Sequence, residues 1–216
     1  MPSMEVWIEY ASTYSYLTVA RIGRLAAQRG VTLDWQPFFL PPVREQQGLG
    51  FPFPEASAKT AHMWRDLERR ADKLGVPYRR PSTYPVNSLP AARVALAGKQ
   101  DGWCQRFTEE AFRLHWTEGC LIGTDDNLRG TLGALGLDVA QVLQLANSPE
   151  NKEALKAQTP RAIERGIFGA PSFVVGNELF WGDDRLEEAA VSDAHVTIIR
   201  AARLRTSLQA RQRLSG

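Results

Sequence analysis

The sequence predicts an α/β fold in which a small sheet is interrupted by an all-helical insertion. Strand patterns occur at the start of the chain and return after Gly166, and helical patterns fill the region between them. One amphipathic helix separates the first two strands. The predicted order is therefore β-α-β, a helical block, and then α-β-β-α.

The first strand is predicted over MEVWIEY, which alternates and is rich in β-branched and aromatic residues. From Tyr14 to about Arg29, apolar residues recur on one helical face, and Gly30 follows as a stop signal. The segment VTLDWQPFF then predicts a second strand that ends with a proline signal. Because such crossovers are right-handed, we expect the two strands to be parallel.

The middle of the chain predicts helices after a loop. The segment LPPVREQQGLGFPFPEAS has no period and is rich in proline and glycine, which predicts a loop leaving the sheet. Helical spacing begins at Met63, and further helices are predicted over NSLPAARVALAG, GWCQRFTEEAFRLHW and TDDNLRGTLGALG. A helix over PENKEALKAQTPRAIERG follows, and we expect Pro160 to kink it or to start a new helix.

Strand signals return in APSFVVGNELFWG, where Gly176-Asn177 suits the turn of an antiparallel hairpin. The segment DDRLEEAAV then begins a helix with acidic residues in its first turn. This order is that of a thioredoxin-like fold with an inserted all-helical domain. We expect residues 1–42 and 160–216 to form the thioredoxin-like domain and residues 43–159 to form the insertion. The basic C-terminal tail predicts a solvated helix or a partner-binding segment.

Composition and spacing exclude several classes of function. A formal net charge of +2 gives no reason to expect nucleic acid or an acidic membrane surface as a partner. The start lacks the order of a secretion signal, and no apolar run approaches the ~20 residues that cross a bilayer, so we expect a cytoplasmic protein. Cys104 and Cys120 are too far apart for a CxxC pair. His62, His115 and His195 show no metal-ligand spacing, so no metal is expected.

Ser12 lies in the turn between the first strand and the first helix. In a thioredoxin-like fold, backbone N–H groups and the helix dipole favour an anion there. Disulfide oxidoreductases of this fold carry a cysteine pair in the turn, which this chain lacks, so dithiol chemistry is excluded. A serine hydroxyl can instead donate to a thiolate of another molecule, and a helix N-cap is the alternative role. Tyr14 and Tyr16 are expected to wall this site or to belong to the helix.

Two further features face the same cleft in such a fold. Ala170-Pro171 directly precedes a predicted strand, and its position in the fold favours a cis peptide bond beside a peptide-like ligand. Asp183 and Asp184 open the last helix, where they either cap the helix or help to receive the amine and carboxylate of an amino-acid ligand.

The chain resembles the 2-hydroxychromene-2-carboxylate isomerases, in the DsbA-like branch that also includes the kappa-class glutathione transferases. Three segments carry the resemblance: YASTYSYLTVARI, the inserted region AKTAHMWRDLERRADKLGVPYRRPSTYPVNSLPAARVAL, and GIFGAPSFVVGNELFWGDDRLE. The match extends from Val6 to about Val191. Thr13 stands where the family usually has proline, and Glu45 where many members have lysine, which Arg44 is a candidate to replace.

The resemblance implies glutathione as the cofactor. Ser12 is then the residue that holds the thiolate, the Ala170-Pro171 backbone pairs with the cysteinyl unit, and Trp181 to Asp184 receive the γ-glutamyl end. Asn87 matches a family asparagine near the cofactor, and it is also an ordinary helix cap. The implied cofactor-binding residues are Ser12, Asn87, Ala170, Pro171, Trp181, Gly182, Asp183 and Asp184.

The implied reaction is the reversible addition of a thiolate to a small aromatic 2-oxo acid. It interconverts 2-hydroxychromene-2-carboxylate with trans-o-hydroxybenzylidenepyruvate, or acts on a related acid, and the resemblance also implies a homodimer. Two alternatives remain open: a kappa-like glutathione transferase, which consumes glutathione, and a non-catalytic thioredoxin-fold module that binds peptides beside Pro171.

Overall fold

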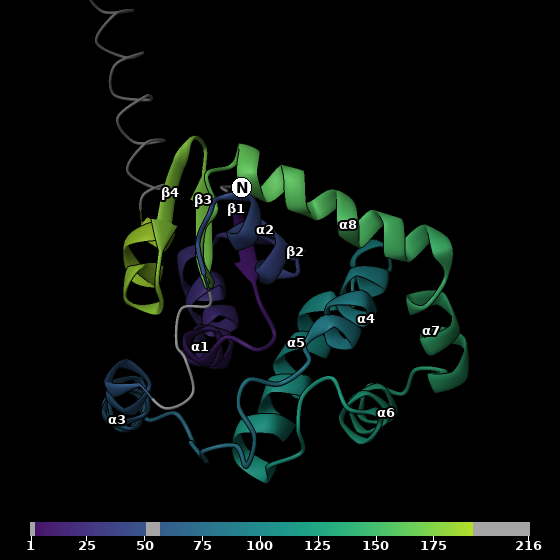
Figure 1. Cartoon of the computed structure of the whole chain (residues 1–216), viewed down its shortest axis with the longest axis horizontal. Helices are drawn as coiled ribbons and strands as arrows, with labels where there is room; N and C mark the ends of the chain where they lie inside the picture. Colours follow the sequence, from purple (N-terminus) through teal and green to yellow (C-terminus); the bar gives the residue numbers. More distant parts are fainter. Residues whose placement is uncertain (1–2, 51–56, 192–216) are drawn as a thin grey trace, which may run out of the picture.

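The sheet is mixed and has four strands in the computed structural model, which describes residues 3–50 and 57–191 (Figure 1). Strands β1 (Ser3–Ile8) and β2 (Thr32–Pro37) are parallel and are joined by α1 (Thr13–Arg29), as predicted. Strand β3 (Ser172–Val175) is antiparallel to β1 and to β4 (Glu178–Trp181), which confirms the hairpin. Trp7 pairs with Ser172, so the end of β1 lies beside the start of β3.

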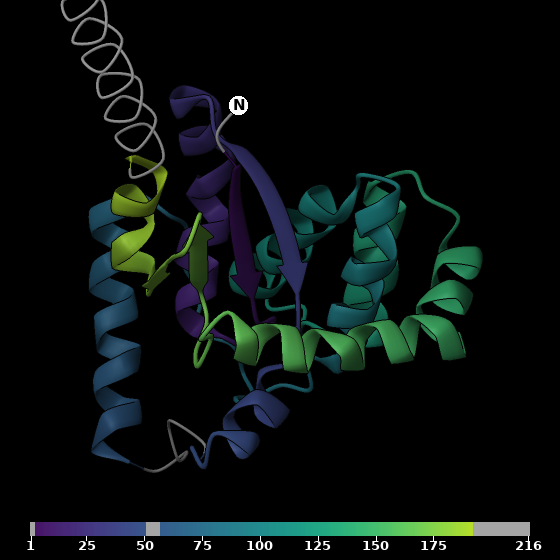
Figure 2. The same cartoon turned by 90° about the horizontal axis from the view of Figure 1, so that it is seen from above.

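The helical block lies between β2 and β3 in the sequence (Figures 1 and 2). Its helices are α2 (Leu40–Gln46), α3 (Ala58–Leu74), α4 (Leu89–Gln100), α5 (Cys104–Arg113), α6 (Asp125–Ala134), α7 (Val139–Ala146) and α8 (Pro149–Glu164). A π-helical segment, η1 (Leu114–Glu118), continues α5, and a short 3-10 helix, η2 (Asp183–Arg185), follows β4. The thioredoxin-like fold with a helical insertion is therefore confirmed.

Two sequence expectations are corrected, and one of the two alternatives for Pro160 is ruled out. The predicted loop after β2 contains α2, which has prolines in its first turn, where a missing N–H is tolerated. Helix α7 was not predicted. Pro160 lies inside α8 and does not start a new helix. The domain boundaries expected at 42/43 and 159/160 consequently fall within α2 and α8, and the expectation for the basic tail concerns residues outside the described part.

The two faces of the sheet are covered by different helices. Alternate side chains of β1 divide between them: Val6 and Ile8 join a large apolar cluster that extends through α1 and the helical block, whereas Trp7 packs with Phe38 beneath α2 and α8. Each of the two clusters contains residues of both the sheet and the insertion, so the insertion packs directly against the sheet. Within the described ranges, no helix is long and apolar enough to cross a membrane.

Candidate functional site

Ser12 is the N-cap of α1 and also contacts the segment before β3. Its Oγ accepts a hydrogen bond from the Ser15 N–H at 3.3 Å and donates to the carbonyl oxygen of Ala170 at 2.9 Å. Helix α1 has 17 residues and no acidic residue in its first turn, so its positive end faces the turn without a competing carboxylate in that turn. Ser12 is therefore both the cap and a hydroxyl at a site suited to an anion.

The segments around Pro171 and Trp181 lie side by side. The peptide bond between Ala170 and Pro171 is cis, as predicted. The Gly182 N–H donates to the Pro171 carbonyl oxygen at 3.0 Å, and Ser172 pairs with Trp181 in the hairpin. Together with the Ser12–Ala170 bond, these contacts bring the Ser12 turn, the Ala170-Pro171 segment and the Trp181 segment to one edge of the sheet, where β1 and β4 end and β3 begins.

Asp183 is a buried ion-pair centre. Its side chain is fully buried and receives Arg21 Nη2 at 2.7 Å and Arg70 Nη2 at 2.6 Å, one on each carboxylate oxygen. Thr18 Oγ1 donates to the same carboxylate at 3.1 Å. These bonds fasten η2 to α1 and α3, so the Asp183 side chain is already occupied by the protein, and its role as a ligand for glutathione stays a prediction.

Trp181 and Asp184 are the exposed members of the predicted γ-glutamyl segment. Trp181 is 53% exposed, and its ring lies 4.8 Å from that of Phe168, measured between centroids. A Cβ at Gly169 would lie 2.3 Å from Trp181 Nε1, so glycine is required for this close approach. Asp184 is exposed, and its nearest described cation is Arg185 at 3.3 Å. Its carboxylate is thus accessible to an amine.

The other hydroxyls near Ser12 attach α1 to neighbouring elements. Thr13 Oγ1 contacts Met63 Sδ at 3.4 Å, and Tyr14 OH donates to Asp66 Oδ2 at 2.9 Å, so both reach α3. Tyr16 is buried, donates to the Pro77 carbonyl and stacks on Trp116. The hydroxyl cluster therefore serves mainly to pack α1, and Ser12 is the member that reaches Ala170.

Glu9 contacts the Ser12 turn, because its backbone carbonyl oxygen accepts from the Ser12 N–H at 3.0 Å. This residue was not identified from the sequence. It is 4% exposed, and its two carboxylate oxygens accept from the N–H groups of Ala11 at 3.0 Å and Leu40 at 2.7 Å. Burial raises its pKa, against the opposing effect of hydrogen bonds from Leu40, Ser88 and other groups. The sequence signal that could have identified Glu9 is an acidic residue within the largely apolar run WIEYAS, which indicates a buried carboxyl group.

The side chains of Asn87 and Arg44 make hydrogen bonds to groups other than Ser12 and Ala170. The Asn87 side chain accepts from the Leu89 N–H at 3.3 Å just before α4, whose N-cap residue is Ser88 and not Asn87. Arg44 donates to the carbonyl oxygens of Gly50 and Phe168, the latter at 3.1 Å. Arg44 thus brings a guanidinium to the loop that precedes Ala170, whereas Glu45 is exposed.

The cysteines and histidines offer no redox or metal site in the described part of the chain. Both cysteines are free, and burial raises the pKa of Cys104 to about 12. His115 is buried, its Nδ1 accepts from the Ile122 N–H at 3.2 Å, and burial lowers its pKa to about 4. The described residues contain no cluster of three or more potential metal ligands.

Trp64, Tyr84 and the phenylalanines of GFPFPEA are the aromatic residues that the sequence offers as candidates to line a substrate pocket. Trp64 is 5% exposed and packs edge-on against Tyr84, with ring centroids 5.1 Å apart, so it belongs to the core. The phenylalanines of GFPFPEA lie outside the described residues.

Comparison with known proteins identifies the family. The profile of the DSBA-like thioredoxin domain matches residues 3–191. The chain belongs to this family. It is 27% identical over 186 residues to a 2-hydroxychromene-2-carboxylate isomerase of Sphingobium xenophagum, covering 86% of this chain and 94% of the relative. A kappa 2 glutathione transferase of Caenorhabditis elegans is 26% identical over 208 residues, covering 88% of this chain and 92% of that protein.

A solved structure agrees with these sequence matches. The structure of a 2-hydroxychromene-2-carboxylate isomerase aligns with a TM-score of 0.81 at 25% identity, covering 95% of this chain and 98% of that one. The similarity therefore extends over the sheet and the helical insertion together.

Proposed function

We propose that this protein is a glutathione-dependent isomerase of the 2-hydroxychromene-2-carboxylate type. It interconverts 2-hydroxychromene-2-carboxylate with trans-o-hydroxybenzylidenepyruvate, or acts on a related aromatic 2-oxo acid. The observation that carries the proposal is the Ser12 hydroxyl, which lies at the start of α1 within 2.9 Å of the Ala170 carbonyl, in a turn without cysteine. The similarity to isomerases of this name supports it.

The residues at this edge fit a thiol-containing γ-glutamyl peptide. Ser12 offers a hydroxyl donor at a helix start without first-turn acids, which suits a sulfur anion. Asp184 offers an exposed carboxylate for an ammonium group, and Trp181 offers an exposed ring beside it. Arg44 offers a guanidinium near Phe168 for a carboxylate.

When bound, glutathione supplies a thiolate whose reversible addition lets a rigid double bond rotate. Ser12 favours the anion by redirecting its hydroxyl proton from the Ala170 carbonyl toward the sulfur. Lowering a thiol pKa from about 8.5 requires about 1.4 kcal/mol per unit. One charge-assisted hydrogen bond of about 1.5–3 kcal/mol and a helix N-terminus of about 0.3–1 kcal/mol are sufficient for a shift of one to two units.

The test follows both the aromatic acid and the free thiol. An isomerase converts many equivalents of 2-hydroxychromene-2-carboxylate per glutathione, while the free-thiol concentration stays constant. A kappa-like transferase, which the similarity to the nematode kappa proteins favours as the second candidate, consumes one thiol per turnover. A peptide-binding module gives no turnover and passes through immobilised glutathione without retention, which would refute the proposal.

A further inference from the structure

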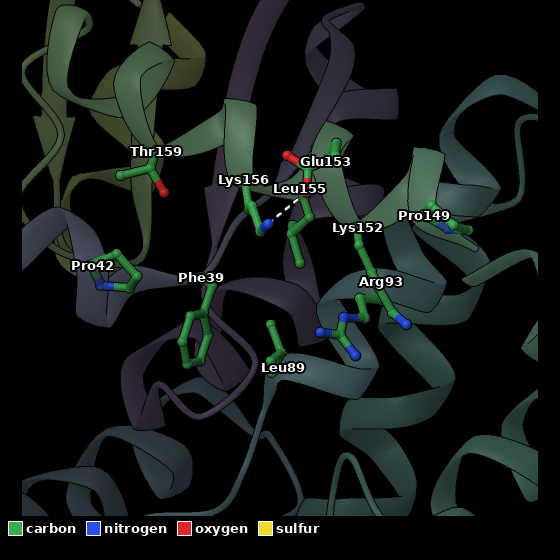
Figure 3. A pocket seen from close by; sticks show the side chains of 10 residues that line it. All are labelled: Phe39, Pro42, Leu89, Arg93, Pro149, Lys152, Glu153, Leu155, Lys156 and Thr159. Atoms are coloured by element: carbon green, nitrogen blue, oxygen red, sulfur yellow. Dashed lines mark hydrogen bonds and ion pairs between the residues drawn. The ribbon is translucent and has the colours of Figure 1, made fainter. Parts of the chain in front are cut away.

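A cavity of about 580 Å³ lies between the start of α2, α4 and α8 (Figure 3). Its volume is in the range of small-molecule sites, about 300–1,000 Å³. None of the 10 residues that line it belongs to the predicted glutathione set. The cavity is therefore a candidate for a second ligand.

Apolar side chains form much of the cavity surface. Phe39 precedes α2, Leu89 begins α4, and Leu155 lies on the buried face of α8. Leu155 is 5% exposed, whereas Phe39 and Leu89 are half-buried and leave part of their surface accessible. Such a surface favours a flat apolar ligand, because its burial removes apolar area from water on both partners.

Among the residues that the structure describes, two cations on the same cavity have no carboxylate partner. Arg93 is on α4 and Lys152 is on α8, and both are half-buried. Asn151 Nδ2 donates to the Arg93 carbonyl oxygen at 3.0 Å, which holds the start of α8 against α4 at this point. In the described ranges Lys156 pairs with Glu153, but no ion pair involves Arg93 or Lys152.

Arg93 and Lys152 are partly exposed to solvent, so a ligand carboxylate between them would gain a modest attraction from both. A bare anion would gain nothing from the apolar side chains, and a neutral ring would leave the cations unpaired. A ligand with both features complements the apolar side chains and these two cations, while Glu153 and Lys156 on the same cavity pair with each other.

We propose that this cavity binds an aromatic carboxylate, with its ring on Phe39, Leu89 and Leu155 and its carboxylate on Arg93 and Lys152. Two sources share this chemistry: the acid on which the proposed reaction acts, and an unrelated aromatic acid that acts as an effector. The site adjoins the Ser12 turn, because Leu40, next to Phe39, donates to Glu9 at 2.7 Å. Glu9 in turn accepts from the Ser12 N–H through its backbone carbonyl at 3.0 Å.

The probe for this site is 2-naphthoate, and its binding is measured by isothermal titration calorimetry without glutathione. We expect tighter binding of 2-naphthoate than of acetate, inorganic phosphate or neutral 2-naphthalenemethanol. Arg93→Gln and Lys152→Gln should each weaken 2-naphthoate binding about five- to tenfold, a modest factor because both cations are partly exposed to solvent. Lys59→Gln, on the exposed surface of α3, is the matched control and should bind like the wild type.

A double variant with unchanged 2-naphthoate affinity, or equal competition by acetate, would overturn the proposal. Weakened binding together with a raised KM for the aromatic 2-oxo acid identifies the ligand as the substrate, whereas weakened binding with an unchanged KM identifies an effector. Ser12→Ala separates this inference from the proposed function, because it should abolish most turnover without changing the affinity for 2-naphthoate.

Discussion

Replacing Ser12 by alanine removes one hydroxyl that makes two bonds. As an acceptor, the hydroxyl caps α1 through the Ser15 N–H at 3.3 Å. As a donor, it bonds the Ala170 carbonyl at 2.9 Å, 158 residues away in sequence. The first bond stabilises the helix, and the second joins the helix start to the segment before β3. In the proposed reaction, the donor proton is also what favours the thiolate.

The structural loss and the catalytic loss have different expected sizes. Loss of the cap costs about 1 kcal/mol, and the neutral hydrogen bond to Ala170 adds about 0.5–1.5 kcal/mol. A loss of 1 kcal/mol lowers Tm by about 2–4 °C in a chain of this length. Loss of a charge-assisted bond to a thiolate costs about 1.5–3 kcal/mol, which lowers the rate about ten- to a hundredfold.

Thr124 offers a matched control, because its hydroxyl makes the same two kinds of bond. It caps α6 through the Asn127 N–H at 3.4 Å and donates to the Leu121 carbonyl at 2.6 Å. Thr124→Ala should therefore lower Tm by an amount similar to Ser12→Ala and leave the rate per folded molecule unchanged. Ser12→Thr keeps a hydroxyl and should recover part of the activity lost in Ser12→Ala.

The assay combines Tm, glutathione affinity and the pH profile of turnover. We expect Ser12→Ala to bind glutathione with similar affinity at low pH and to shift the rising limb of the rate toward higher pH. If Ser12→Ala behaves like Thr124→Ala, with a lower Tm but an unchanged rate and pH profile, Ser12 is only a helix cap and the assignment of the site is wrong.

Two further predictions concern buried and exposed ionisable groups. Asp183→Asn should destabilise the fold by about 3 kcal/mol, because Arg21 and Arg70 lose a buried carboxylate partner. Asp184→Asn should leave Tm unchanged and weaken glutathione binding several-fold, because Asp184 is exposed. Thermal melts and calorimetry on the two variants check this prediction, and equal effects of the two changes would contradict it. Burial lowers the pKa of His115 from 6.5 to about 4. Between these pH values the unfolded chain binds a proton on His115 that the folded protein does not bind. The free energy of unfolding therefore falls by up to about 3 kcal/mol as the pH drops through this window. Urea unfolding from pH 7 to pH 4 measures the slope, and His115→Gln should flatten it; a slope unchanged by this substitution would refute the assignment to His115.

Local patterns predicted the parts of the fold that have strong periodicity or clear stop signals. Helix α1 has an amphipathic face and ends at Gly30, which adopts a left-handed conformation with φ of 66°. The hairpin follows from alternating β residues around Gly176-Asn177. Helices α2 and α7 were missed because each is short. In α2, the prolines that permit its first turn also resemble a loop signal.

Local sequence patterns could not predict contacts between residues that are far apart in the chain. The sequence placed Asp183 and Asp184 together as one acidic pair, and nothing in the dipeptide distinguishes them. Their difference arises from Arg70, 113 residues away, which reaches Asp183 and leaves Asp184 exposed. Likewise, the approach of Ser12 to Ala170 depended on the fold assignment, because only the antiparallel pairing of β1 and β3 brings those segments together.

The distribution of negative charge around the turn bears on the role proposed for Ser12. The first turn of α1 contains no acid, and burial raises the pKa of Glu9, which favours its neutral form beneath the turn. The charge of Asp183 is balanced by two guanidinium groups, and Asp184 is exposed, where water screens it. Asp66 of α3 also reaches the start of α1, where it accepts the Tyr14 hydroxyl at 2.9 Å. In the proposed function, the positive end of α1, which has no acid of its own in the first turn, and the Ser12 hydroxyl act together on the thiolate.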